Sequence, residues 1–242
     1  MRRMIWTSAV VAMSGVITAV GACGDGEPTT SITTSPDGDV GSDSGGTTTS
    51  PDGEPGSDSG GTTDARPCNG APACARTVFV TKGLYSPDFA TDGGITAADD
   101  LCAKEANEST LASVKARTWV AWISTSSMPA KDRHVHGTGP YRRPRGTKIA
   151  DDWDHLTGLG GKALAAPIAE TADGREMDVG AVPGVWTGTS RTGDHDGQDC
   201  GGWTMFDANF TGASGHFLNT TAWSKLYDST CDDKKRLYCI EQ

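Results

Sequence analysis

The densest group of positive charge in the sequence lies at residues 141–148. Arg142, Arg143, Arg145 and Lys148 follow Tyr141 closely. Guanidinium groups match the geometry of sulfate, phosphate and carboxylate, and they bind these anions through paired hydrogen bonds. The cluster is therefore the best candidate contact surface for an extracellular protein or a sulfated glycan. The alternative is an exposed charged loop that only keeps the surface soluble.

A second candidate is the acidic, glycine-rich stretch Asp194-His195-Asp196 with Asp199. Three carboxylates so close together could supply oxygen ligands to a hard cation such as calcium. No fixed ligand geometry accompanies Asp194, Asp196 and Asp199, so a solvated polar loop is the simpler interpretation. We therefore expect no cofactor, and we keep these four residues as ligand-binding candidates.

His134 and His136 are a third candidate, because side chains two residues apart share one face of a strand. Together with a third ligand such as Asp132 they could bind zinc. No third ligand has a recognisable spacing, so we expect no metal site. Ser190, Ser214 and His216 offer hydroxyls and an imidazole, but the sequence has no nucleophile elbow, metalloprotease helix or phosphate loop. We therefore expect a protein that is not an enzyme.

The N-terminal segment has the features of an export signal. Two arginines precede an apolar run at residues 10–20, which is too short to span a membrane. The run ends in Val20-Gly21-Ala22-Cys23, which resembles a bacterial lipobox with Cys23 as the lipidated residue. An ordinary cleavage after Ala22 is the alternative. Lipidation of Cys23 would leave six of the seven cysteines, an even number suited to disulfides. We expect anchoring to the outer membrane or cell surface.

Composition divides the chain into three parts. Residues 1–22 form the lipoprotein signal peptide, residues 23–67 a disordered tether, and residues 68–242 the folded domain. The tether consists mostly of Gly, Ser, Thr, Asp and Pro, and its residues 33–47 recur with two changes as residues 48–62. The net charge of the chain is −10, and residues 24–67 hold nine acidic residues against one arginine. Because the domain is only mildly acidic and has no strongly basic face, we expect no nucleic-acid partner.

Several elements of the domain can be read from local patterns. The β-branched run at residues 77–81 predicts a strand, and the run at residues 118–124, apolar on both faces, predicts a central strand. Thr96 stands three residues before Asp99, which predicts a capping box at the start of a helix. On that helix Cys102 falls on the apolar face. Residues 149–159 predict one or two helical turns.

The cysteines and tryptophans of the last third mark a core. The stretch holds Trp186, Trp203, Trp223, Cys200, Cys231 and Cys239. Large aromatic side chains contribute most of the buried area of small cores. Cys68 and Cys74 bracket a short loop, so a local disulfide between them is expected. Six cysteines allow fifteen complete pairings.

Motifs spread over residues 76–242 resemble the endostatin-like bacterial lipoprotein family, which is built on the C-type-lectin-like fold. They are Phe79-Val80, Gly93-Gly94, Cys102, the strand from Trp119, Tyr141 with Gly146-Thr147-Lys148, Trp186-Thr187-Gly188, Cys200, Trp203, Trp223, Cys231 and Leu237-Tyr238-Cys239. The resemblance implies an α+β, C-type-lectin-like (endostatin-like) disulfide-bonded domain with long irregular loops. It also implies the pairs Cys102–Cys239 and Cys200–Cys231.

The resemblance implies binding rather than catalysis, because family members with assigned roles are mostly surface adhesins for matrix proteins, host regulators or sulfated glycans. The calcium-binding triplets of sugar-binding C-type lectins are absent from this sequence. We therefore expect a lipid-anchored surface protein whose domain binds a macromolecular or glycan ligand. The alternatives are a structural surface protein without a specific ligand, or a metal-dependent hydrolase.

Overall fold

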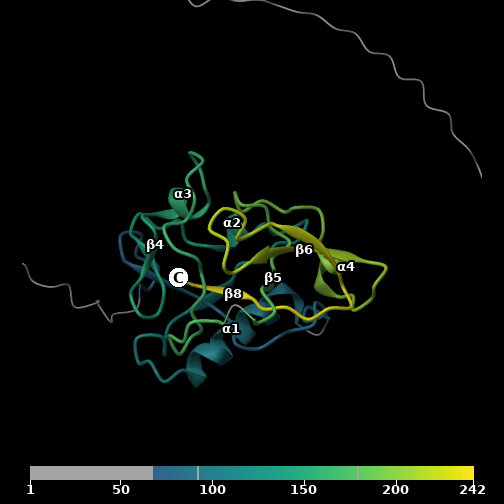
Figure 1. Cartoon of the computed structure of the whole chain (residues 1–242), viewed down its shortest axis with the longest axis horizontal. Coiled ribbons are helices and arrows are strands. Elements are labelled where there is room, and N and C mark those ends of the chain that lie inside the picture. The colour runs from purple at the N-terminus through teal and green to yellow at the C-terminus, as the bar shows by residue number, and fades with distance from the viewer. Residues whose placement is uncertain (1–67, 92, 179) are drawn as a thin grey trace, which may run out of the picture. The chain divides into compact units, whose positions relative to one another are not determined.

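The computed structural model describes residues 68–91, 93–178 and 180–242. The predicted signal peptide, the lipidation site Cys23 and the predicted tether lie outside these residues. The described part is a mixed α and β structure (Figure 1). Its elements are β1 (Arg76–Val80), η1 (Gly94–Thr96), α1 (Ala97–Glu108), β2 (Trp119–Ala121), α2 (Ala130–Arg133), β3 (Tyr141–Arg142), β4 (Lys148–Ala150), α3 (Trp153–Leu156), β5 (Gly184–Trp186), α4 (Cys200–Trp203), β6 (Thr211–His216), β7 (Tyr227–Thr230) and β8 (Tyr238–Glu241).

The strands form two sheets. The larger sheet has the order β2-β8-β1-β3-β4, and the smaller has the order β5-β6-β7. The first and last strands pair antiparallel, with Phe79 opposite Cys239. In Figure 1, α1 lies along β8, while α4 and β6 lie at the opposite end of the domain from α3 and β4. None of the helices in the described ranges is long and apolar enough to span a membrane.

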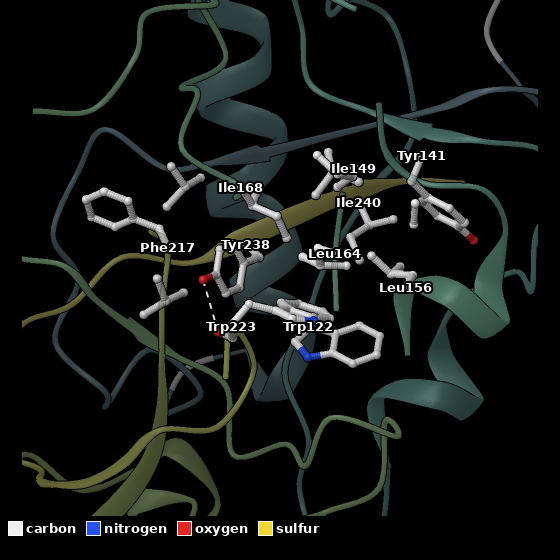
Figure 2. Close-up of a cluster of buried hydrophobic side chains, with 14 of the residues drawn as sticks. Trp122, Tyr141, Ile149, Leu156, Leu164, Ile168, Phe217, Trp223, Tyr238 and Ile240 are labelled. Atoms are coloured by element: carbon white, nitrogen blue, oxygen red, sulfur yellow. Dashed lines mark hydrogen bonds between the residues drawn. The ribbon is translucent and has the colours of Figure 1, made fainter. Parts of the chain in front are cut away.

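The alternation of side chains along β1 and β8 separates two apolar cores. Successive residues of a strand point to opposite faces. Val78 and Val80 accordingly join one cluster, while Phe79 joins the other. Figure 2 shows Tyr238 and Ile240 of β8 in the first cluster, with Trp122 and Trp223. There the Tyr238 hydroxyl donates a hydrogen bond to the Trp223 carbonyl at 3.0 Å.

The second core lies between the larger sheet and α1. Ala98, Cys102 and Ala106 follow one face of α1 and are buried, as the helical spacing predicts. Phe79 contacts Trp119 edge-on in this core, with ring centroids 4.7 Å apart. The small residues of α1 allow the helix to approach the sheet closely, which places Cys102 next to β8.

Three disulfides link these elements. Cys102 of α1 pairs with Cys239 of β8, and Cys200 pairs with Cys231 across the base of the segment between α4 and β7. These are the two pairs that the family resemblance implies. Cys68 and Cys74 are also joined, with their Cα atoms 5.7 Å apart, as their spacing predicts.

The strand from Trp119 is an edge strand, which corrects the prediction of a central one. The three residues of β2 pair only with β8. Its outer edge is covered by side chains instead: Asp99 accepts from the Ala121 amide at 2.8 Å, and Arg133 donates to the Ala121 carbonyl at 3.1 Å. Trp119 and Ala121 are buried, whereas Val120 on the other face is only partly buried, so apolar character on both faces did not indicate a central position.

The predicted capping box at Thr96 is also absent. Thr96 has helical backbone angles, and its hydroxyl donates back to the Gly93 carbonyl at 3.0 Å. Asp99 cannot close the box because its carboxylate binds Arg133 through both oxygens at 2.7 Å. The helix therefore begins from a 3-10 turn. The turns predicted at residues 149–159 prove to be β4 followed by the short helix α3.

Candidate functional site

The predicted basic surface at residues 141–148 is a tight hairpin between β3 and β4. Tyr141 is fully buried, and its hydroxyl accepts a hydrogen bond from the Gly137 amide at 3.1 Å. Burial raises the pKa of this phenol. Tyr141 therefore belongs to the core and cannot contact a ligand at the surface, which corrects its place among the candidates.

Two cations of this cluster have carboxylate partners. Arg143 has its Nε 3.1 Å from Glu170 and its Nη1 2.9 Å from Glu176. The Lys148 ammonium lies 2.6 Å from Asp151. Two of the four positive charges that the sequence concentrates here are thus paired with carboxylates of the same chain.

The other two cations bind backbone carbonyls. Arg142 donates to the Gly146 carbonyl at 3.0 Å within the hairpin, and Arg145 donates to the Gly174 carbonyl at 2.5 Å. A guanidinium that is committed to a carbonyl stabilises a turn and presents fewer donors to an anion. Arg142 and Arg145 therefore each use one guanidinium nitrogen to hold a turn of the same chain.

The acidic stretch is divided among separate ion pairs. Asp194 lies 2.5 Å from the Lys131 ammonium, which holds the pKa of this carboxyl below its usual range. Asp196 lies 2.5 Å from Lys225. Each carboxylate faces its own cation, so the two do not converge on a shared point.

Asp199 has a different role again. Its carboxylate accepts from the Gly202 amide at 2.9 Å and caps α4, and its second oxygen lies 3.2 Å from His195. Within residues 68–91, 93–178 and 180–242, no group of three or more His, Cys, Asp or Glu side chains is arranged to hold a metal ion. Calcium binding at Asp194, Asp196 and Asp199 would require breaking all three sets of contacts.

The two histidines predicted to share a strand face lie in different environments. His134 is buried, with its ring centroid 5.4 Å from that of Trp122, and the Gln242 amide lies 3.0 Å from its Nδ1. His136 is exposed and stacks on Trp153 at 4.2 Å. Neither lies in a strand, because α2 ends at Arg133 and an irregular segment follows. They therefore do not form a metal-binding pair.

Burial, and to a smaller extent the nearby positive charge of Arg133, lower the pKa of His134 to about 3. The unfolded chain would bind a proton at this residue below pH ~6.5, whereas the folded chain would not until about pH 3. We expect stability from this group to be complete above pH ~6.5 and to fall, by up to about 1.4 kcal/mol per pH unit, as the pH drops toward 3. Urea midpoints measured across this range for wild type and His134→Gln test this, and equal slopes for the two would contradict it.

A pocket of about 440 Å³ lies beside the C-terminal half of α1. The carboxylate of Glu105 lines it and accepts from the amides of Lys82 and Gly83 and from the hydroxyl of Tyr85, at 2.6–2.8 Å. Burial and this bond to Glu105 raise the pKa of Tyr85. Glu105 is therefore occupied as a structural acceptor, and this arrangement gives no support to a hydrolase.

The exposed apolar residues point to a different part of the molecule. Residues 204–210 are all exposed, and they include Met205, Phe206 and Phe210, which are 40%, 49% and 39% exposed. These are three of the eight large apolar side chains exposed among the described residues. We call residues 204–210 the apolar loop. In Figure 1 it follows α4, at the end of the domain away from α3 and β4.

The base of the apolar loop is attached to the core. Trp203 is fully buried beneath it, donates from its indole to the Ser124 carbonyl at 2.7 Å and stacks on Phe89 at 5.5 Å. The disulfide between Cys200 and Cys231 closes the loop below its two ends.

The tip of the apolar loop is held by a local turn. One oxygen of Asp207 accepts from the Asn209 amide at 2.8 Å, and the Phe210 amide donates to the Asp207 carbonyl at 3.1 Å. The Phe210 carbonyl in turn accepts from the Cys231 amide at 3.0 Å. The exposed side chains are thus carried on an ordered backbone, which lowers the entropy cost of binding.

Phe206 and Phe210 are not among the residues predicted from the sequence, because composition alone does not distinguish exposed aromatic residues from core ones. The available signal was the turn-forming Asp207 and Asn209 between Phe206 and Phe210. A turn between Phe206 and Phe210 is incompatible with a continuous strand or helix through these residues.

No protein-family model matches this sequence, and no curated protein matches it.

Proposed function

We propose that this chain is an exported, lipid-anchored surface protein whose folded domain is a non-catalytic binding module. The observation that carries the proposal is the apolar loop, which holds Met205, Phe206 and Phe210 exposed on an ordered backbone. Single exposed apolar residues are ordinary on a protein surface, whereas three large ones within residues 205–210 mark a candidate contact site. The ionic candidates, in contrast, mostly contact groups of the same chain.

The C-type-lectin-like fold is part of this proposal. The antiparallel pairing of β1 with β8 supports it, because that pairing brings the two ends of the domain together. Two disulfides support it further. Cys102–Cys239 joins α1 to β8, and Cys200–Cys231 lies beneath the apolar loop. These are the connections that the resemblance to endostatin-like lipoproteins implies.

Export and anchoring rest on the sequence of the N-terminal segment and on the disulfides. Three disulfides in one domain favour an oxidising compartment outside the cytosol. The lipobox-like segment ending at Cys23 supports attachment to the outer membrane or cell surface. Mass spectrometry of the protein isolated from its own membranes should find a diacylglyceryl modification on Cys23, and an unmodified N-terminus would contradict the anchor.

A binding array tests the proposed function. The full mature chain is applied to an array of extracellular matrix proteins and glycans, with and without a chelator. We expect at least one ligand whose affinity falls on the order of 10–100-fold in the variant Phe206→Ser/Phe210→Ser, because truncated aromatic anchors cost the most at interfaces. The chelator should change nothing.

The matched control is Leu159→Ser/Val182→Ser, which removes two apolar side chains exposed outside the loop, at 51% and 44%. This control should bind as the wild type does. Absence of any bound ligand, or equal affinity of wild type and Phe206→Ser/Phe210→Ser, would contradict a binding role for the apolar loop.

A further inference from the structure

The charges beside the apolar loop narrow the class of its partner. Residues 199–212 contain two aspartates and no Lys, Arg or His. Asp199 is paired with His195, whereas Asp207 sits at the tip of the loop, where its side chain accepts only from Asn209. The loop itself therefore presents apolar side chains together with a negative charge.

Two neighbouring segments add further acids. Asp232 is exposed and follows Cys231, whose amide binds the Phe210 carbonyl. Asp88 precedes Phe89, which stacks on Trp203 beneath the loop. The adjacent cations offset these charges only in part.

The cations in question lie in the turn at residues 231–235. Lys234 is exposed there, while the Lys235 ammonium lies 2.6 Å from Asp233. Lys235 also packs over the buried Trp186, 5.0 Å from its ring centroid. Lys234 is thus the one cation of this turn that does not contact a carboxylate. The three carboxylates of Asp88, Asp207 and Asp232 outnumber it, so the net charge beside the loop is negative.

We propose that the apolar loop binds a protein whose surface carries an apolar pocket rimmed by Lys and Arg side chains. This inference rests on the proposed function and specifies the partner at the same site. Aromatic anchors that fill pockets supply affinity, and complementary charges at the rim steer association. Sulfated glycans and anionic lipid surfaces are disfavoured, because both would bring negative charge against Asp88, Asp207 and Asp232.

Panning of a phage-displayed random peptide library on the immobilised full chain tests the inference. We expect the enriched peptides to combine aromatic or aliphatic residues with Lys or Arg. Binding kinetics of an enriched peptide are then measured for wild type, Phe206→Ser/Phe210→Ser, Asp207→Asn/Asp232→Asn and the control Leu159→Ser/Val182→Ser. Asn at position 207 keeps an oxygen that can accept from the Asn209 amide, so the turn is preserved while the charge is lost.

The two test variants should change different rate constants. Loss of Phe206 and Phe210 should raise the dissociation rate, with affinity falling on the order of 10–100-fold. Loss of the charges on Asp207 and Asp232 should lower the association rate about 3–10-fold at low salt, and the difference from wild type should shrink as salt is raised. The control should match the wild type.

Three results would overturn the inference. The first is enrichment of acidic peptides, or of peptides that bind Asp207→Asn/Asp232→Asn with unchanged association rates. The second is binding of heparin or of phosphatidylglycerol vesicles that requires Phe206 and Phe210. The third is a concentration-dependent dimer, detected by sedimentation and lost in Phe206→Ser/Phe210→Ser, which would identify a second copy as the occupant.

These results also separate the two proposals. Heparin or vesicle binding through Phe206 and Phe210 would refute the protein partner and keep the binding role of the apolar loop. Failure of every probe to depend on these two residues would refute the binding role as well.

Discussion

Replacing Cys102 and Cys239 together by alanine should lower the free energy of unfolding by about 5 kcal/mol. The bond joins residues 137 apart in sequence, and it links α1 to the last strand. Cross-linking over so long a loop removes much of the conformational freedom of the unfolded chain. Because single domains are stable by only about 5–15 kcal/mol, this loss should leave the domain close to unfolding.

Urea denaturation of the variants measures this loss. The control is the pair Cys68→Ala/Cys74→Ala, which removes a bond across only six residues. Its expected loss is about half as large, since the loop-entropy contribution grows with the logarithm of loop length. Equal losses for the two pairs, or a stable domain without the Cys102–Cys239 bond, would contradict a large contribution of this bond to the stability of the domain.

The substitution Glu241→Ala should destabilise the domain by about 3–5 kcal/mol. The Glu241 side chain is fully buried, pairs with the guanidinium of Arg117 and accepts from the amides of Thr77 and Cys68 at 2.9 and 3.1 Å. Its removal leaves a cation whose side chain is only 4% exposed without its carboxylate partner, and two amides without acceptors. The carboxylate therefore links the N-terminal end of the folded domain, at Cys68 and Thr77, to its last strand.

Asp151→Ala is the comparison for Glu241→Ala. It removes the ion pair with Lys148, in which the two side chains are 47% and 53% exposed, together with the contact to His155, and it should cost less than about 1 kcal/mol. Chemical denaturation of both variants at neutral pH gives the two values. A cost for Glu241→Ala as small as that for Asp151→Ala would show that Glu241 does not hold the two ends together.

Local sequence patterns were sufficient for the features that depend on neighbours along the chain. The β-branched run that predicts β1 and the helical spacing that turns Cys102 inward both correspond to elements of the structure. The disulfide from Cys102 to Cys239 did not follow from local patterns, because six cysteines allow fifteen pairings. For that bond the distributed resemblance was required.

Features that depend on distant partners differ from the sequence-based predictions for a physical reason. Asp99 was expected to cap its own helix, but it binds the Ala121 amide, 22 residues away, and Arg133. Arg143 was expected to be free for a ligand, but Glu170 and Glu176 reach it from another segment. Charge density along a sequence does not show which charges the fold will neutralise.

The apolar loop illustrates the same difficulty for aromatic residues. Trp203 and Phe206 are three positions apart, yet the first is fully buried and the second is 49% exposed. The difference arises at α4, where Gly201 and Gly202 have φ values of 66° and 71° and the chain turns out of the core. Such left-handed angles are readily adopted by glycine, but their presence could not be read from the sequence alone.

The central claim, that residues 204–210 form the binding surface, is tested most directly by hydrogen–deuterium exchange of the full chain with and without a peptide enriched by panning. We expect the peptide to protect the backbone of the apolar loop and of the adjoining turn at residues 231–235, and to leave exchange in the hairpin at residues 141–148 unchanged. Protection of that hairpin with unaltered exchange in the apolar loop would contradict a binding role for residues 204–210.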